Sequence, residues 1–253
     1  MQRSALTCRL RAAGIHFLIS ALVVGVVLTL ASWLWYPDWF FYASGLLGMA
    51  TVLAIVDLVI GPLLTLVVYK PGKPSLRFDL SVIAAIQLAA LVYGVSSMYW
   101  ARPVYVALVV DRFEVVAAAD LEESSLAEAP EPYRDLPATR APGWVTVNLP
   151  TDPRELEAIM MAETLNGTGP ALMPKYYSGF ERVPPAAMQR TRALDELARF
   201  NDPALVEKSL QALGEARDGL RYLPLSGVGR DMTVLVRAAD GTVVKTLNLR
   251  PWS

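Results

Sequence analysis

Residues 57–65 read Asp-Leu-Val-Ile-Gly-Pro-Leu-Leu-Thr and lie inside an apolar run that extends from residue 43 to residue 69. Asp57 is the only charged residue in that run. An ionisable group at membrane depth is unfavourable by at least about 2.5–3.5 kcal/mol on insertion scales, so it is retained for a partner or a function. The Gly61-Pro62 pair predicts a kink beside it, because Pro62 lacks an N–H and its ring crowds the carbonyl four residues back.

The overall composition indicates a chain in two parts. Its 253 residues are 54% hydrophobic with a mean hydropathy of +0.37, which is too apolar for an ordinary soluble domain. Residues 1–100 carry six Lys and Arg against three Asp, whereas residues 101–253 carry 17 Lys and Arg against 21 Asp and Glu. The sequence therefore predicts a membrane module followed by a mildly acidic domain, with no basic surface of the kind that binds nucleic acid.

Three apolar runs are long enough to cross about 30 Å of hydrocarbon as helices. They cover about residues 15–34, 43–69 and 80–100, and residues 1–14 precede them. The alternative for the first run is a cleaved signal peptide. We interpret it as a retained anchor, because its apolar core exceeds the roughly 7–15 residues of a signal sequence.

Basic residues set the expected direction of these spans. They precede the first run and lie between the second and third, and the loop between the first two runs has none: Arg3, Arg9, Arg11, Lys70, Lys73 and Arg77. By the positive-inside rule the N-terminus and the second loop are cytoplasmic. Three spans then place residues 101–253 in the periplasm of a bacterium, with the spans in its inner membrane.

Aromatic residues crowd the loop after the first span, at residues 33–42, and Tyr99 and Trp100 end the third span. Trp and Tyr concentrate at the lipid–water boundary. We therefore interpret these rings as an interfacial belt. The alternative is an aromatic binding patch for the membrane helix of a partner.

From residue 103 the pattern predicts one α+β domain. Asp152, Pro153 and Glu155 have the spacing of a helix start with a capping box, and Leu156, Ile159 and Met160 mark its apolar face. We expect strands at 104–110, 112–117 and 144–149, helices at 152–166, 185–200 and 202–214, an irregular connection at 120–143, and a hairpin of 232–239 and 242–249 with a two-residue type I′ turn at Asp240-Gly241.

Residues 101–253 contain neither His nor Cys, since Cys8 and His16 are the only residues of those types. Ser-His and Cys-His nucleophile systems and ordinary zinc sites are therefore excluded from this part. Carboxylates are plentiful there, but nothing brings two of them together at a defined spacing. We assign no catalytic, cofactor-binding or metal-binding residue.

Depth along the helices ranks the possible partners of Asp57. At 1.5 Å per residue, Asp57 lies about 18 Å from the cytoplasmic face, Gln87 about 10 Å and Tyr93 about 20 Å. We therefore expect Tyr93 to bond to Asp57, with Gln87 more distant and His16, at the face itself, unable to pair directly. The alternatives are that Asp57 is satisfied internally or that it is offered to a partner. The candidate site, structural or partner-binding, comprises Asp57, Gly61, Pro62, Gln87 and Tyr93.

Short motifs are spread over nearly the whole chain: LRAAGIH (10–16), WYP (35–37), DLVIGPLLT (57–65), KPGK (70–73), DL (79–80), ARPVY (101–105), DRF (111–113), YLPL (222–225) and DMT (231–233). On these motifs the sequence resembles the TfpX/TfpZ-type accessory proteins of type IV pilins. The segment from 57 to 73 is the most specific part of the resemblance.

The resemblance implies a non-enzymatic, chaperone-like protein of the inner membrane, without a cofactor. Its implied partner is the major type IV pilin, bound through the pilin membrane helix, with the globular head as a further contact and the lipid bilayer around the spans. Two alternatives stay open from the residues alone. One is a membrane-anchored enzyme that modifies pilin or envelope glycans, and the other is a component of a small channel or transporter.

Overall fold

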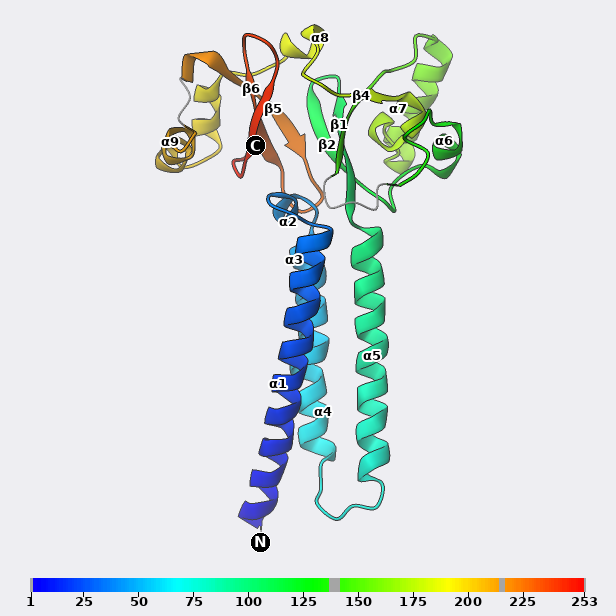
Figure 1. The fold of residues 1–253 in the computed structure, drawn as a ribbon, viewed down its shortest axis with the longest axis vertical. Coiled ribbons are helices and arrows are strands. Elements are labelled where there is room, and N and C mark those ends of the chain that lie inside the picture. The colour runs from blue at the N-terminus through cyan, green and yellow to red at the C-terminus, as the bar shows by residue number, and fades with distance from the viewer. Residues whose placement is uncertain (1, 137–141, 214–216, 253) are drawn as a thin grey trace. The chain divides into compact units, whose positions relative to one another are not determined.

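The computed structural model describes residues 2–136, 142–213 and 217–252. The chain divides into two compact units (Figure 1). The membrane unit comprises Met1–Leu34 and Leu46–Trp100, and the folded unit comprises Trp35–Gly45 and Ala101–Ser253. The segment Trp35–Gly45 therefore groups with the folded unit, although it joins two long helices of the membrane unit.

The membrane unit consists of helices: α1 (Gln2–Leu34), then α3 (Leu46–Ala54), η1 (Ile55–Ile60) and α4 (Gly61–Val68) in one continuous run, then α5 (Leu76–Trp100). Three stretches are long and apolar enough to cross a membrane: Leu6–Leu34, Leu46–Val68 and Leu76–Trp100. This confirms the predicted class, a membrane protein with three spanning helices and a following α+β domain. The first span begins nine residues before the apolar run that predicted it, and the bounds of the other two lie within four residues of theirs.

The second span contains a π-helical turn, η1. The N–H of Gly61 bonds to the carbonyl of Val56, five residues back, instead of the residue four back. This wider turn comes directly before Pro62, which has no N–H to donate. Local π-helical turns are one way in which membrane helices accommodate proline. The distortion expected at Gly61-Pro62 is therefore present, as a widened turn.

The folded unit is built on one mixed sheet of seven strands in the order β4-β3-β1-β2-β5-β6-β7. β1 runs parallel to β3 and β2 parallel to β5, and the other neighbours are antiparallel. The strands are β1 (Pro103–Val109), β2 (Arg112–Ala117), β3 (Gly143–Val147), β4 (Tyr177–Gly179), β5 (Leu220–Ser226), β6 (Met232–Arg237) and β7 (Val243–Leu247). Sequence patterning missed β4 and β5.

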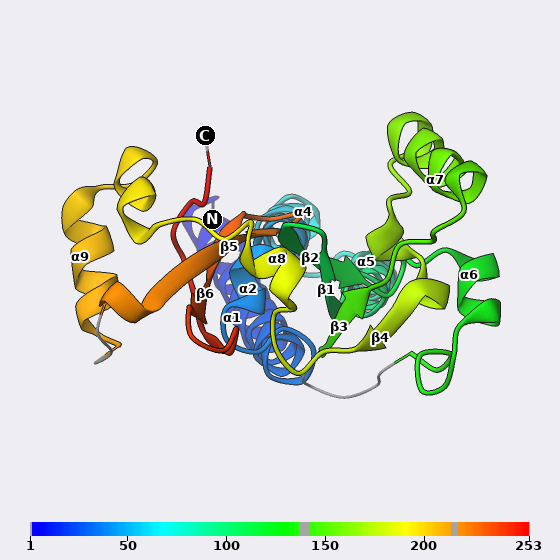
Figure 2. The ribbon, with the colours of Figure 1, turned by 90° about the horizontal axis from the view of Figure 1, so that it is seen from above.

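Short helices flank the two ends of this sheet (Figure 2). Within the folded unit, α6 and α7 lie toward the β4 end and α9 lies on the side of β5 and β6. The helical segments are α2 (Phe40–Ala43), α6 (Glu123–Glu128), α7 (Pro153–Asn166), η2 (Pro170–Leu172), η3 (Pro174–Tyr176), α8 (Pro185–Met188), η4 (Leu194–Arg199), α9 (Pro203–Gln211) and η5 (Arg217–Gly219).

The central core cluster of the folded unit includes residues from the first loop of the chain. Phe40 and Ala43 of α2 are buried with Phe113 of β2 and Leu225 of β5. The Phe113 ring lies edge-on to Trp144, with 5.1 Å between their centroids. The loop at residues 33–42 was predicted to form an interfacial belt. That interpretation is wrong for Phe40, because this ring packs into the domain core.

Helix α7 begins as predicted but differs in two details. Asp152 caps it by accepting a hydrogen bond from the N–H of Arg154 (2.9 Å), and Gly167 ends it with φ +71°. The capping box is not formed, because Glu155 accepts a hydrogen bond from the hydroxyl of Tyr176. The predicted apolar face is also wrong in part: Ile159 is buried, whereas Met160 is exposed.

The predicted helix at 185–200 is two separate pieces, α8 and η4. Between them Arg192 exchanges two backbone hydrogen bonds with Tyr222 of β5 (2.9 and 3.0 Å). This strand-like bridge draws the backbone out of the helical conformation. The connection at 120–143 contains α6, and its residues 137–141 lie outside the described ranges. Gly214, the predicted end of the third helix, also lies outside them.

The C-terminal hairpin is confirmed, with a longer turn than predicted. Arg237 pairs with Thr242, so that four residues lie in the loop, and the N–H of Gly241 bonds to the carbonyl of Arg237 (2.9 Å). A type I′ turn needs positive φ at both central residues. Only Gly241 has it (φ +74°), because the Asp240 carboxylate accepts from the N–H of Thr242 and Asp240 keeps a negative φ.

Candidate functional site in the membrane unit

A continuous series of hydrogen bonds joins the three spans of the membrane unit. Gln87 of α5 donates from Nε2 to Oδ1 of Asp57 (3.3 Å) and to the main-chain oxygen of Asp57 (3.2 Å). Oε1 of Gln87 lies 2.6 Å from Nε2 of His16 in α1. Nδ1 of His16 lies 2.5 Å from Oγ1 of Thr65 in α4. We call Asp57, Thr65, Gln87 and His16 the polar network.

The chemistry of these groups fixes the direction of two of the bonds. An amide oxygen only accepts, so Nε2 of His16 carries a hydrogen and donates to Gln87. The amide nitrogen of Gln87 only donates, so Asp57 is the acceptor at that end of the polar network. The hydroxyl of Thr65 can donate or accept, so its bond to Nδ1 of His16 suits either protonation state of the ring.

Asp57 is the acidic member of the polar network, and it is buried. It is 4% exposed, and its Oδ2 atom is buried without a hydrogen-bond partner among the described residues. A buried polar atom that lacks a partner is unfavourable by about 1–3 kcal/mol. Oδ2 is therefore a buried acceptor for which the described residues supply no donor.

Gly61 makes room for Gln87. A Cβ atom at Gly61 would lie 2.1 Å from Nε2 of Gln87, closer than any real contact. Gly61 follows Asp57 by four residues and precedes Thr65 by four, so the three positions share one face of the span. Pro62 is buried beside them and terminates the π-helical turn that carries Asp57. These residues are thus brought together at the polar network.

The prediction that Tyr93 bonds to Asp57 is wrong. Tyr93 is 77% exposed, and Gln87 takes the position instead. Six residues separate them on α5, which turns Tyr93 by about 240° to another face at 3.6 residues per turn. Asp57 and Gln87 lie at the same depth along their helices. The number of residues from Asp57 to Val68, the end of α4, equals the number from Leu76, the start of α5, to Gln87.

His16 and Thr65 are functional candidates that the depth argument missed. The helix α1 begins at Gln2, so His16 lies well inside a span and not at its edge. It does not pair directly with Asp57, as expected, but it reaches Asp57 through Gln87. The four-residue spacing of Asp57, Gly61 and Thr65 was the signal in the sequence that could have identified Thr65.

A groove of about 600 Å³ opens beside the polar network, between α1, α4 and α5. His16 and Thr65 form part of its wall, and most of the rest is apolar. The lining residues are Cys8, Arg11, Ala12, Ile15, His16, Ile19, Thr65, Tyr69, Leu80 and Ala84. The groove therefore offers an apolar surface with polar groups at one side.

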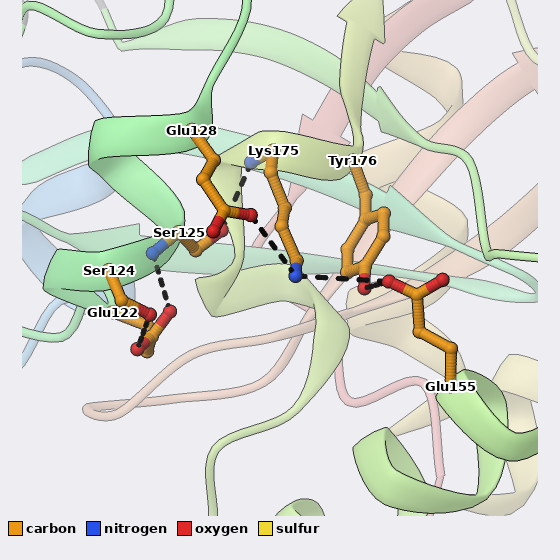
Figure 3. Close-up of polar contacts among 7 residues, drawn as sticks. All are labelled: Glu122, Ser124, Ser125, Glu128, Glu155, Lys175 and Tyr176. Carbon is orange, nitrogen blue, oxygen red and sulfur yellow. Dashed lines mark hydrogen bonds and ion pairs between the residues drawn. The ribbon is translucent and has the colours of Figure 1, made fainter.

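The folded unit carries a separate polar cluster at α6, α7 and η3 (Figure 3). Lys175 lies 3.5 Å from Oε2 of Glu128 and 3.8 Å from Oε1 of Glu155, and the Tyr176 hydroxyl donates to Glu155 (2.6 Å). Burial opposes the charge on Lys175, but Tyr176 and Glu128 outweigh this and raise its pKa. The main-chain N–H of Lys175 also donates to the buried Ser125. These contacts fasten two helices to one segment, which is a structural role.

Comparison with known proteins bears on the function of this arrangement. The fimbrial assembly protein of serogroup I from Dichelobacter nodosus is 34% identical over 127 residues, which is 49% of each chain. The fimbrial assembly protein of serogroups C1 and C2 from the same organism is 33% identical over 119 residues, 46% of this chain and 91% of that relative. The chain belongs to the family of fimbrial assembly proteins.

Membership in the fimbrial assembly family rests on part of the chain. The chain spans about half the length of the serogroup I and E1 proteins that it matches. No family profile and no solved structure matches it.

Proposed function

We propose that this member of the fimbrial assembly family is an accessory protein of type IV pili, of the TfpX/TfpZ type. In this proposal it binds its cognate pilin in the bacterial inner membrane and holds it for assembly. The observation that carries the proposal is the likeness to proteins named for fimbrial assembly, in a chain with three spans. The basic residues favour a cytoplasmic N-terminus and a periplasmic folded unit.

The groove between α1, α4 and α5 is the proposed receptor for the membrane helix of the pilin. Transmembrane helices associate through close packing and interhelical hydrogen bonds, because lipid gives little hydrophobic driving force. The polar network holds the groove walls in one arrangement, which reduces the ordering needed on binding. The apolar wall at Ile15, Ile19 and Ala84 supplies packing, and His16 with Thr65 supplies polar groups.

Filling the groove tests this proposal. Ala84→Trp places a large ring among the lining residues, whereas Leu88→Trp puts the same ring on an exposed position of α5 outside the lining. The measurement is the amount of pilin that co-purifies with each full-length variant from cells, at matched levels of the accessory protein. We expect capture to fall several-fold for Ala84→Trp and to persist for Leu88→Trp. Equal capture by the two variants contradicts the groove as receptor.

A second measurement separates assembly from chemical modification. The mass of pilin recovered from cells with and without the protein should be identical, while the number of pili falls without it. A mass difference would identify the protein as an enzyme that modifies pilin and would contradict the proposal.

Asp57 variants distinguish the two roles left open for this residue. Asp57→Asn keeps an acceptor for Gln87 but removes the carboxyl, whereas Asp57→Ala removes both. If Oδ2 is offered to the pilin, both variants lose capture while the protein itself stays present. If Asp57 is satisfied internally, Asp57→Asn retains capture and only Asp57→Ala loses it.

A further inference from the structure

The loop between β5 and β6, residues 227–231, carries an unusual apolar side chain. Val228 is 82% exposed, the highest value among the large apolar residues that the structure describes, although it belongs to the folded unit. Arg230, two residues on, is also exposed. At a membrane surface an apolar side chain can enter the headgroup layer and a basic one can bind anionic lipid, the two contacts that interfacial segments use.

The conformation of this loop is fixed by its own contacts. The Asp231 carboxylate accepts from the N–H of Gly227 (3.2 Å) and from Nε1 of Trp252 (2.6 Å). These bonds close the loop at its base. Val228 is therefore held outward and does not fold back onto the sheet.

The loop is also held against the segment that leads into the second span. The N–H of Gly229 donates to the carbonyl of Ala43 (2.8 Å). A Cβ atom at Gly229 would lie 2.5 Å from the nitrogen of Gly45 and 2.5 Å from the carbonyl oxygen of Tyr42, so only glycine permits this approach. Val228 itself is in contact range of Gly45, with its Cγ1 3.8 Å from a Cβ placed there.

The place of Gly45 in the chain indicates how close Val228 lies to the membrane. Gly45 is the residue directly before Leu46, where the membrane-spanning stretch Leu46–Val68 begins. A loop that is hydrogen-bonded to Ala43 lies close to the end of a span, which is the depth of the lipid headgroups. Tyr42, half exposed in the same segment, is a residue type that favours that depth.

We propose that the β5–β6 loop is an interfacial anchor, with Val228 inserted among the lipid headgroups and Arg230 bound to the phosphate of anionic lipid. The anchor attaches the folded unit to the membrane surface at a further point, besides the three covalent connections at Trp35, Gly45 and Ala101. This role is independent of pilin binding, because it needs only the spans and the loop.

Lipid quenching tests the anchor on the full-length protein. Cys8, the only cysteine, is replaced by Ser, and a small fluorophore is attached to Cys introduced by Val228→Cys. The matched control is Leu165→Cys, a 70% exposed apolar position on α7 in the same unit. The protein is placed in vesicles of phosphatidylethanolamine and phosphatidylglycerol that contain lipids with a nitroxide either at the headgroup or deep in the acyl chain.

We expect the headgroup nitroxide to quench the fluorophore at 228 strongly, the deep nitroxide to quench it less, and neither to quench the fluorophore at 165. A probe at 228 that is quenched no more than the control overturns the anchor. A probe at 228 that is shielded from aqueous iodide but not quenched by either lipid also overturns it, because a protein surface then covers the loop.

The part played by Arg230 has its own test. Arg230→Gln in the labelled protein should lower the quenching at 228 in vesicles with phosphatidylglycerol to the level seen in vesicles of phosphatidylcholine alone. Quenching that does not depend on the anionic lipid in the unmutated loop overturns the assignment of Arg230 to lipid phosphate.

Discussion

In the membrane unit the buried positions include the polar Asp57 and Thr65 beside the apolar Leu46 and Met98, whereas the central core of the folded unit buries Phe113 and Leu225. The apolar side chains of the spans are mostly exposed on the protein surface, where lipid surrounds them. In water, burial of apolar surface drives folding. In lipid that driving force between helices is largely absent, so hydrogen bonds and small residues decide which faces meet. The spans therefore bury polar groups such as Asp57 and Thr65 beside apolar side chains such as Leu46 and Met98, while most of their other apolar side chains face lipid.

The largest effect expected from this difference is in the folded unit. Phe113→Ala removes a fully buried ring and should destabilise the unit by about 3–5 kcal/mol, as large-to-small changes in cores do. Phe78→Ala removes the same atoms from a 71% exposed position of α5 and should leave that stability unchanged. Urea unfolding of the full chain in micelles, followed by tryptophan fluorescence, compares them. Similar losses of stability for both variants would contradict the proposed difference between the two units.

A smaller effect is expected at the centre of the polar network. Gln87→Leu removes the side chain that links α1 to the second span, and we expect a loss of about 1–2 kcal/mol, the range of interhelical hydrogen bonds in model membrane helices. The measurement is resistance to unfolding of the helices by a denaturing detergent. The neighbouring, lipid-exposed Leu88→Ala is the control. An unchanged Gln87→Leu would mean that the network does not hold the spans together.

Alanine substitutions at Gly61 and Gly25 are expected to change the stability of the membrane unit in opposite directions. Gly61→Ala forces Gln87 to move, so part of the loss seen for Gln87→Leu should appear. Gly25→Ala meets no atom within 4 Å, and alanine favours helix over glycine by up to about 1 kcal/mol, so this variant should be as stable or more stable. The same detergent unfolding measures both. A stabilised Gly61→Ala would show that Gln87 adapts without loss.

The smallest expected effect concerns pH and the surface of the folded unit. Hydrogen bonds from the hydroxyl of Ser124 and the N–H of Ser125 lower the pKa of Glu122, the N-cap of α6. Because the folded-state pKa lies below the unfolded one, this stabilisation is present at neutral pH and is lost as the pH falls through the folded value. Glu122→Gln should therefore reduce the loss of unfolding free energy that occurs as the pH falls, by less than about 1 kcal/mol.

Thermal unfolding of the full chain between neutral and acid pH measures this difference. The neighbouring exposed Glu123→Gln is the control and should follow the unmutated profile. A profile for Glu122→Gln that is parallel to the unmutated one would contradict the contribution of the cap.

Local signals in the sequence predicted local structure well. The spans, the start of α7 at Asp152 and the C-terminal hairpin all follow from patterns within a few residues. The failures involve partners that are distant in the chain. β5 pairs with β2, about a hundred residues away, and Arg192 leaves its helix for Tyr222. No local pattern contains such pairings.

In the candidate site, too, residues with a local signal were identified and contacts between different helices were not. Asp57, Gly61 and Pro62 were identified because an acidic residue and a proline are rare in a span. Gln87 was placed second to Tyr93, because depth along a helix was estimated from apolar runs and the rotation around the helix was not considered. His16 was set at the membrane edge, since apolarity does not show that α1 continues toward the N-terminus as a helix through Arg9 and Arg11.

The burial of Phe40 and Ala43 in the folded unit has a consequence for how this chain is made. Residues 35–45 leave the ribosome long before β5 and β6 are synthesised. This part of the domain core is therefore at the membrane before the strands that pack against it have been made. Contacts of such high sequence separation form late and slowly. Synthesis of the domain without its spans, from residue 101 onward, would omit this piece and leave the cluster around Phe113 and Leu225 open. Folding of residues 101–253 is therefore completed on a segment that membrane insertion has already put in place.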